Sequence, residues 1–107
     1  MSNSRLSRIE KQIADIKEEL MEIGEMRPGS LTKQFKNPKD KTGGFYQLSY
    51  THKMKSKTEY VRLHHLDELR KQVNAYKKFK KLFEKWVELS IKRSKLKMDI
   101  SNQGRLK

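Results

Sequence analysis

The sequence predicts an α+β fold that is mainly α: an antiparallel hairpin of a short N-terminal helix and a long C-terminal helix, with a β-hairpin inserted between them. Three observations lead to this prediction. Residues 6–23 carry an apolar heptad pattern, residues 66–98 carry apolar stripes at helical spacing, and residues 45–63 alternate between apolar and polar side chains. The 107 residues are enough for one domain rather than two.

The first helix is predicted within residues 1–26. Its seam repeats at intervals of three and four residues, which is typical of a helix that packs against a partner helix. Gly24 weakens the helix, and Pro28 prevents its continuation. Three heptads are marginal for an isolated helix, so the seam needs a partner. The seam consists of Leu6, Ile9, Ile13, Ile16, Leu20 and Ile23.

Residues 27–44 are predicted to form an irregular basic loop. Two turn-forming dipeptides, Pro-Gly and Asn-Pro, interrupt this segment. Its lysines follow no apolar period, and only Leu31 and Phe35 offer anchors to a core. We therefore expect a cationic loop that leads into the hairpin.

The β-hairpin is predicted over residues 45–63, with its tip at residues 53–56. A lone hairpin is not stable in water, so its apolar face must lie on the helices. The opposite face is expected to be polar and to expose Tyr60 and Arg62. The expected register pairs Leu48 with Val61, Tyr46 with Leu63 and Tyr50 with Glu59.

The second helix is predicted over residues 64–100, and residues 101–107 are predicted to be a frayed tail. Two apolar stripes run along this helix, which indicates contacts on two sides. The first stripe suits the seam of the N-terminal helix, and it consists of Leu66, Leu69, Val73, Tyr76, Phe83, Val87 and Ile91. The second stripe is left for the hairpin or a second subunit, and it consists of Phe79, Leu82, Trp86, Leu89 and Leu96. A basic ridge remains, formed by Lys78, Lys81, Lys85 and Lys92.

The sequence carries no pattern typical of an enzyme. It contains no cysteine, so disulfides, thiolate metal sites and cysteine nucleophiles are excluded. The adjacent pair His64-His65 points in two directions and lacks partners for a metal. We expect no catalytic residue, no metal and no cofactor. No apolar run approaches the roughly 20 residues of a membrane span, so we expect a cytoplasmic protein without a membrane partner.

The charge is large and unevenly distributed. The formal net charge is +13. Residues 1–26 carry four basic and six acidic side chains, whereas residues 27–57 carry eight and one, and residues 58–107 carry fourteen and six. An ordinary soluble surface mixes the two signs. The imbalance predicts contact with a polyanion, nucleic acid first. Only seven of the cations are arginine, which favours phosphate contact over base reading.

The candidate nucleic-acid-binding residues lie in the basic loop, the hairpin and the helical ridge. They are Lys33, Lys36, Lys39, Lys41, Lys53, Lys55, Lys57, Tyr60, Arg62, Lys78, Lys81 and Lys85. Tyr60 is the candidate for stacking on unpaired bases. The alternative is a solvated surface on a coiled-coil protein-interaction module, or on a homo-oligomeric regulator whose charge docks an acidic partner. Its candidate interface, for a second copy or another protein, consists of Phe79, Leu82, Trp86 and Leu89.

Several short motifs, within residues 26–97, resemble an uncharacterised bacterial and archaeal family of unknown function that is often encoded near transposases. The motifs are Gly-Ser-Leu at 29–31, GFYQLSYT at 44–51, Tyr-Val at 60–61 and VNAYKKFKKL at 73–82. The family has a cysteine-bearing loop where this chain has KNPKDK at 36–41. The resemblance implies a link to mobile DNA, so DNA is favoured over RNA as the partner. The sequence thus predicts a small, non-enzymatic accessory protein that binds nucleic acid, and the resemblance implies an origin in a mobile element or phage.

Overall fold

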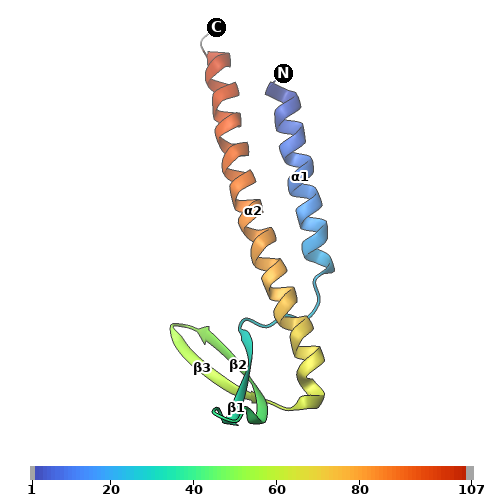
Figure 1. Cartoon of the computed structure of the whole chain (residues 1–107). Coiled ribbons are helices and arrows are strands. Elements are labelled where there is room, and N and C mark those ends of the chain that lie inside the picture. The colour runs from blue at the N-terminus through green and yellow to red at the C-terminus, as the bar shows by residue number, and fades with distance from the viewer. Residues whose placement is uncertain (1, 106–107) are drawn as a thin grey trace. The chain divides into compact units, whose positions relative to one another are not determined.

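The computed structural model describes residues 2–105, and its architecture is α+β and mainly α, as predicted. Along the chain, the strands of the sheet come between the two helices (Figure 1). A 3₁₀ turn, η1, joins the sheet to the second helix. The elements are α1 (Ser2–Glu22), β1 (Ser30–Asn37), β2 (Thr42–His52), β3 (Lys55–Val61), η1 (Leu63–His65) and α2 (Leu66–Arg105).

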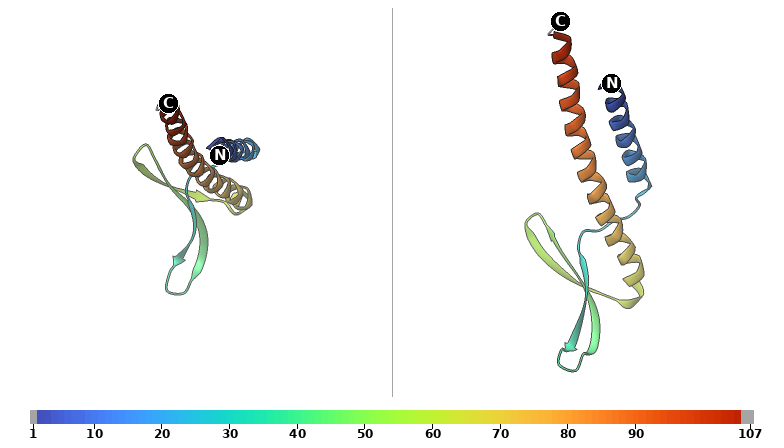
Figure 2. Two further views of the ribbon diagram at one scale, coloured as in Figure 1. Left: turned by 90° about the horizontal axis from the view of Figure 1, so that it is seen from above. Right: turned by 45° about the horizontal axis from the view of Figure 1, so that its top comes forward.

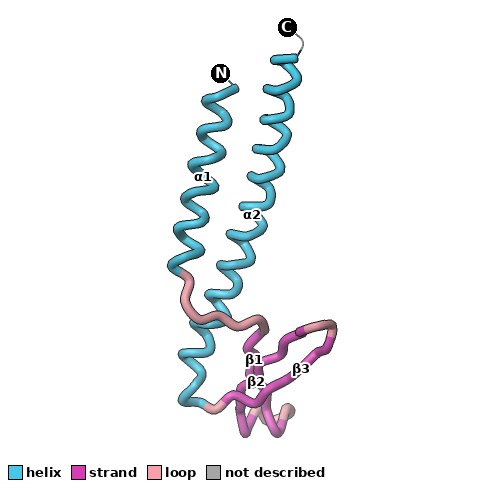
Figure 3. The backbone as a smooth tube through the Cα atoms, turned by 180° about the vertical axis from the view of Figure 1, so that it is seen from behind, coloured by secondary structure: helices cyan, strands magenta, loops and turns pink. Residues whose placement is uncertain are grey.

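Several predicted boundaries were wrong. The basic loop predicted over residues 27–44 contains a strand, β1, and the start of β2, so the inserted element is a three-stranded sheet and not a hairpin (Figure 3). The predicted tail at residues 101–107 is helical as far as Arg105, and residues 106–107 lie outside the described part. Within the described residues, no helix combines the length and the apolarity needed to cross a membrane.

The contacts divide the chain into two compact units. The helical unit contains residues 1–23 and 79–107, and the sheet unit contains residues 24–78. Helix α2 contributes residues to both units. The expectation of a single folding domain stays a prediction.

In the helical unit, α1 packs in antiparallel fashion against the later part of α2. Ile9, Ile13 and Ile16 of the predicted seam are buried together with Leu89 of α2. Arg93 donates a hydrogen bond to Glu10 over 3.2 Å, and Lys17 lies 5.3 Å from the centre of the Trp86 ring. Because residue numbers along α2 fall as those along α1 rise, these two contacts fix the antiparallel direction.

The stripe of α2 that packs against α1 is not the one that was predicted. Leu82, Trp86 and Leu96 pack with Leu89 against the α1 seam. They belong to the stripe that was expected to contact the hairpin or a second subunit. The predicted partner stripe is divided. Its early residues Leu66, Leu69 and Val73 pack within the sheet unit, and its later residues Phe83, Val87 and Ile91 stay exposed.

The sheet unit contains an antiparallel sheet with strand order β1-β2-β3. The β2–β3 pairing aligns Tyr46 with Val61 and Leu48 with Glu59, two residues away from the predicted register. The turn is accordingly shorter, with only Lys53 and Met54 between the strands. A shift of two residues keeps every side chain on its predicted face, because side chains alternate along a strand with a period of two.

One face of this sheet, here called the inner face, supports the core of the sheet unit. Leu48 is completely buried at its centre. Val61 is buried beside it, and the early part of α2 covers both with Leu66 and Val73. The expected place of Leu63 in this core was wrong. Leu63 lies in η1 and is 77% exposed, because the chain has already left the sheet.

Candidate nucleic-acid interface

The opposite, outer face of the sheet is polar and is not covered by any other part of the sheet unit. Alternation places every second residue of each strand there, away from Leu48. The side chains are mainly hydroxyls and amides, with two aromatic rings and one lysine among them. The outer face consists of Ser30, Thr32, Gln34, Lys36, Phe45, Gln47, Ser49, Thr51, Ser56, Thr58 and Tyr60.

An aromatic pair forms the apolar part of the outer face. The ring centres of Phe45 and Tyr60 are 6.1 Å apart, and the rings are tilted by 35°. Register explains the contact, because Tyr60 pairs with Gln47, the neighbour of Phe45 on the same side of β2. Tyr60 is 68% exposed, whereas Phe45 is half-buried. The predicted exposure of Tyr60 is confirmed, and Phe45 is an addition that the sequence reasoning missed.

The two turns of the sheet lie at opposite ends of it (Figure 2), and both turns carry lysines. Lys39 and Lys41 lie in the turn that precedes β2, and Lys53 lies in the turn that follows it. Strand β2 has 11 residues, which span roughly 35 Å in an extended strand. The two turns therefore form separate cationic ends, with the outer face between them, rather than one cluster.

Three predicted binding lysines project from the inner side of the sheet instead of from the outer face. Lys55 and Lys57 pair with His52 and Tyr50, which lie on the side of Leu48. Lys33 is on that side too, and its Nζ lies 5.5 Å from the centre of the Phe35 ring. The reason is again strand parity. All three lysines are exposed.

The remaining predicted cations are exposed but dispersed. Arg62 follows β3 and precedes η1. Lys78 belongs to the sheet unit, whereas Lys81 and Lys85 belong to the helical unit. Each unit therefore carries part of the predicted basic ridge. Within the described residues, no group of three or more histidine, aspartate and glutamate side chains is arranged to hold a metal ion.

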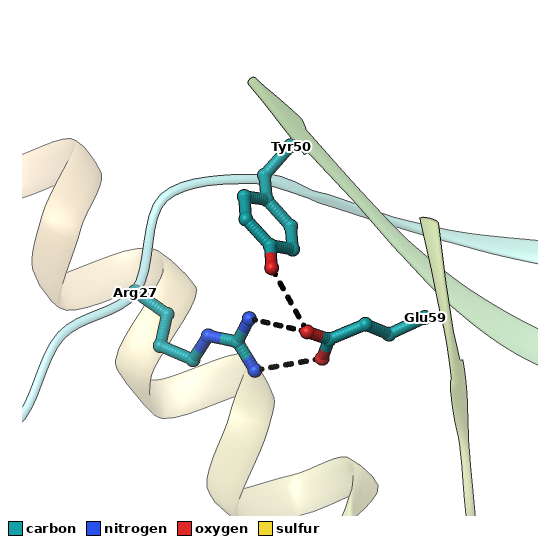
Figure 4. A network of polar contacts seen from close by, with 3 residues as sticks. All are labelled: Arg27, Tyr50 and Glu59. Atoms are coloured by element: carbon teal, nitrogen blue, oxygen red, sulfur yellow. Dashed lines mark hydrogen bonds and ion pairs between the residues drawn. The ribbon is translucent and has the colours of Figure 1, made fainter. Parts of the chain in front are cut away.

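A polar network on the inner side connects the segment before β1 to the sheet (Figure 4). Arg27 donates two hydrogen bonds to the Glu59 carboxylate, from Nη1 to Oε2 over 3.1 Å and from Nη2 to Oε1 over 3.3 Å. The Tyr50 hydroxyl donates to Oε1 of Glu59 over 3.0 Å. The Arg27 guanidinium also lies 5.1 Å from the centre of the Tyr50 ring.

This network alters the ionisation of its three members. The hydrogen bonds from Arg27, and then from Tyr50, lower the pKa of the Glu59 carboxyl. The hydrogen bond to Glu59 raises the pKa of Arg27 and that of Tyr50. The Arg27 guanidinium is therefore paired with the Glu59 carboxylate. No local sequence pattern indicates this contact, because 32 positions separate Arg27 from Glu59.

The predicted protein interface is largely occupied within the chain. Leu82, Trp86 and Leu89 pack against α1, so they are not a free stripe. Phe79 is half-buried, and its ring is stacked at 6.0 Å from that of Phe83. The periodicity alone did not distinguish which of two stripes α1 would cover.

No protein-family model, curated protein or solved structure matches this chain. The resemblance to the transposase-linked family is untested by these comparisons and stays a prediction.

Proposed function

We propose that the protein binds single-stranded nucleic acid on the outer face of its sheet and has no catalytic role. The observation that carries the proposal is the exposed Tyr60 ring beside Phe45 on an uncovered, polar sheet face. Aromatic rings on such a face stack with unpaired bases without regard to sequence. The hydroxyl and amide side chains around the pair offer hydrogen bonds to base edges and sugars.

The charge of the sheet unit supports the same proposal. Residues 24–78 contain thirteen basic and five acidic side chains. Glu59 is one of the five, and Arg27 neutralises it. Lys36 on the outer face and the lysines of the two turns would contact phosphates on either side of the aromatic pair. A nucleic-acid strand that lies along the sheet from one turn to the other would contact lysines at both ends.

Single-stranded DNA is favoured over RNA as the ligand. An accessory role in a mobile element or phage is also part of the proposal. That part depends only on the family resemblance. The stacking and the phosphate contacts do not require it.

Fluorescence anisotropy with labelled oligonucleotides tests the proposal. We expect binding to single strands at low salt, with affinity that falls as salt rises because each neutralised phosphate releases counterions. Single-stranded and duplex DNA and RNA of one length should be compared. Absence of binding at low salt, or tight binding that is insensitive to salt, would contradict the proposal.

Tyr60→Ala tests the stacking contact. Loss of one base–aromatic stack costs about 1–3 kcal/mol, so single-strand affinity should fall roughly five- to 150-fold. Tyr60→Phe retains the ring and is the matched control, which should bind nearly as well as the wild type. Heparin is the second probe, since it has charge but no bases. If Tyr60→Ala weakens heparin binding equally, or leaves oligonucleotide binding unchanged, the aromatic pair is not a base platform.

A further inference from the structure

The later part of α2 has an apolar face that nothing in the helical unit covers. Phe83, Val87, Ile91 and Met98 are between 43% and 56% exposed. Together with Ser94 they form what is here called the free stripe. It lies roughly 145° around the helix from the side that packs on α1, at 100° per residue. An open groove follows it, lined also by Trp86, Ser90 and Lys95.

The spacing of the free stripe suits another helix. Val87, Ile91, Ser94 and Met98 follow one another at intervals of four, three and four residues, which is a heptad pattern. Ser90 and Ser94 have small side chains, so a second helix can approach closely. The partner that fits the free stripe is therefore a helix with an apolar seam of its own.

The charges beside the free stripe select the occupant and its direction. Glu88 and Lys95 lie seven residues apart on the same edge of the stripe, and both are exposed. Among the described residues, neither forms an ion pair or hydrogen bond. In an antiparallel pair of identical helices, like edges meet. Glu88 of each copy then faces Lys95 of the other, which gives two reciprocal ion pairs.

A parallel pair lacks this complementarity. In that arrangement each edge meets the opposite edge of the second helix, so Glu88 would face Phe83 of the other copy and Lys95 would face Ser90. The antiparallel register also places Val87 against Met98 of the second copy, and Ile91 against Ser94. We infer that the free stripe is a homodimer interface in which two α2 helices pair in antiparallel fashion. This inference does not depend on the proposed nucleic-acid binding.

Sedimentation equilibrium without nucleic acid tests the dimer. The wild type should approach twice the chain mass of 12.8 kDa as its concentration rises. The interface is a single helical stripe, so we expect dissociation on dilution. Ile91→Glu should restore the monomer mass with an unchanged helical circular dichroism spectrum. Met21→Glu is the matched control, because Met21 is 86% exposed on α1, and it should remain dimeric. A wild type that is monomeric at every concentration overturns the inference.

Charge exchange and cross-linking test the direction. Lys95→Glu should weaken the dimer by placing glutamates opposite each other, and the double variant Glu88→Lys/Lys95→Glu should restore it. The chain has no natural cysteine, so introduced ones report specifically. Val87→Cys mixed with Met98→Cys should form a mixed disulfide on mild oxidation, whereas Val87→Cys alone should not. Self-cross-linking of Val87→Cys without the mixed product would show a parallel pair and overturn the antiparallel assignment.

Discussion

The helical unit and the sheet unit differ in how completely they bury apolar surface. The sheet unit surrounds Leu48 on all sides and leaves it 0% exposed. In the helical unit the best-buried residues, Ile16 and Leu89, keep 5% and 7% exposure, and the other side of α2 remains open. A sheet with a helix on it can close a core within 55 residues of chain, whereas two helices share only one seam. This difference explains why the helical unit leaves a continuous apolar face of α2 exposed.

Leu48→Ala should have the largest effect on stability. Removing a fully buried leucine side chain costs about 2–5 kcal/mol, because the lost burial adds to the cavity that remains. We expect loss of amide protection in strands β2 and β3, measured by hydrogen exchange, and a lower urea midpoint. Leu63→Ala is the control, since Leu63 is 77% exposed, and its effect should stay within about 0.5 kcal/mol. Equal effects of the two variants would contradict the closed core.

Leu89→Ala addresses the helical unit. It should cost about 2 kcal/mol, at the lower end of the range for leucine, because an open seam can collapse onto the vacated space. Trp86 is the only tryptophan and packs on the same seam, so its fluorescence reports this change directly. A loss that exceeds that of Leu48→Ala would reverse the ranking of the two units. Met21→Ala is the control, because Met21 is exposed on α1 and lies outside this seam.

Gly29→Ala should destabilise the sheet unit by about 1–3 kcal/mol. Gly29 has a φ of 135°, and an added Cβ would lie 2.8 Å from Leu48 Cδ1 and 2.9 Å from the Ser49 carbonyl oxygen. Both the backbone and the space therefore require glycine. Gly24→Ala is a matched control just five positions away, because a Cβ there meets nothing within 4 Å. Urea unfolding of the two variants should separate them clearly, and a neutral Gly29→Ala would show that the approach to β1 adapts.

The helices were predictable because their signals are local. The α1 seam repeats over three heptads, and Ile9, Ile13 and Ile16 are buried as expected. Which α2 stripe would meet it was not predictable, since both stripes have helical spacing and only packing decides between them. The length of α2 at its C-terminal end was underestimated, because the last residues are mostly polar and show no apolar periodicity.

The sheet was harder to predict for two physical reasons. In β1, Leu31 and Phe35 lie on one face, but Lys33 lies between them on the same face and breaks the apolar alternation. The sequence of this segment therefore predicted a loop. In the β2–β3 turn, Lys53 and Met54 have φ angles of 51° and 66° without glycine or asparagine, so the usual signal for a two-residue turn is missing. The outer face was nevertheless assigned correctly for Tyr60, because a two-residue error in register preserves parity.

The smallest expected effect concerns pH and the contact between Arg27 and Glu59. Both side chains remain partly exposed, at 33% and 45%, and an ion pair of this kind contributes only about 0.2–1 kcal/mol. The pKa of Glu59 is lower in the folded chain than in the unfolded one, since Arg27 and Tyr50 hydrogen-bond its carboxylate. Its contribution is therefore complete above the unfolded pKa, near 4.3, and is lost as pH falls through the folded value.

Urea unfolding between about pH 3 and pH 7 measures this contribution. The wild type should lose stability toward acid more steeply than Glu59→Gln, which retains the shape of the side chain but cannot ionise. Other carboxylates titrate in the same range, so the difference between the two proteins is the informative quantity. Glu84→Gln removes a carboxylate from the helical unit and is the control. If Glu59→Gln follows the wild type at every pH, the network adds no ionic stabilisation, and the segment around Arg27 is held to the sheet unit by its backbone bond to Gln72 and by packing.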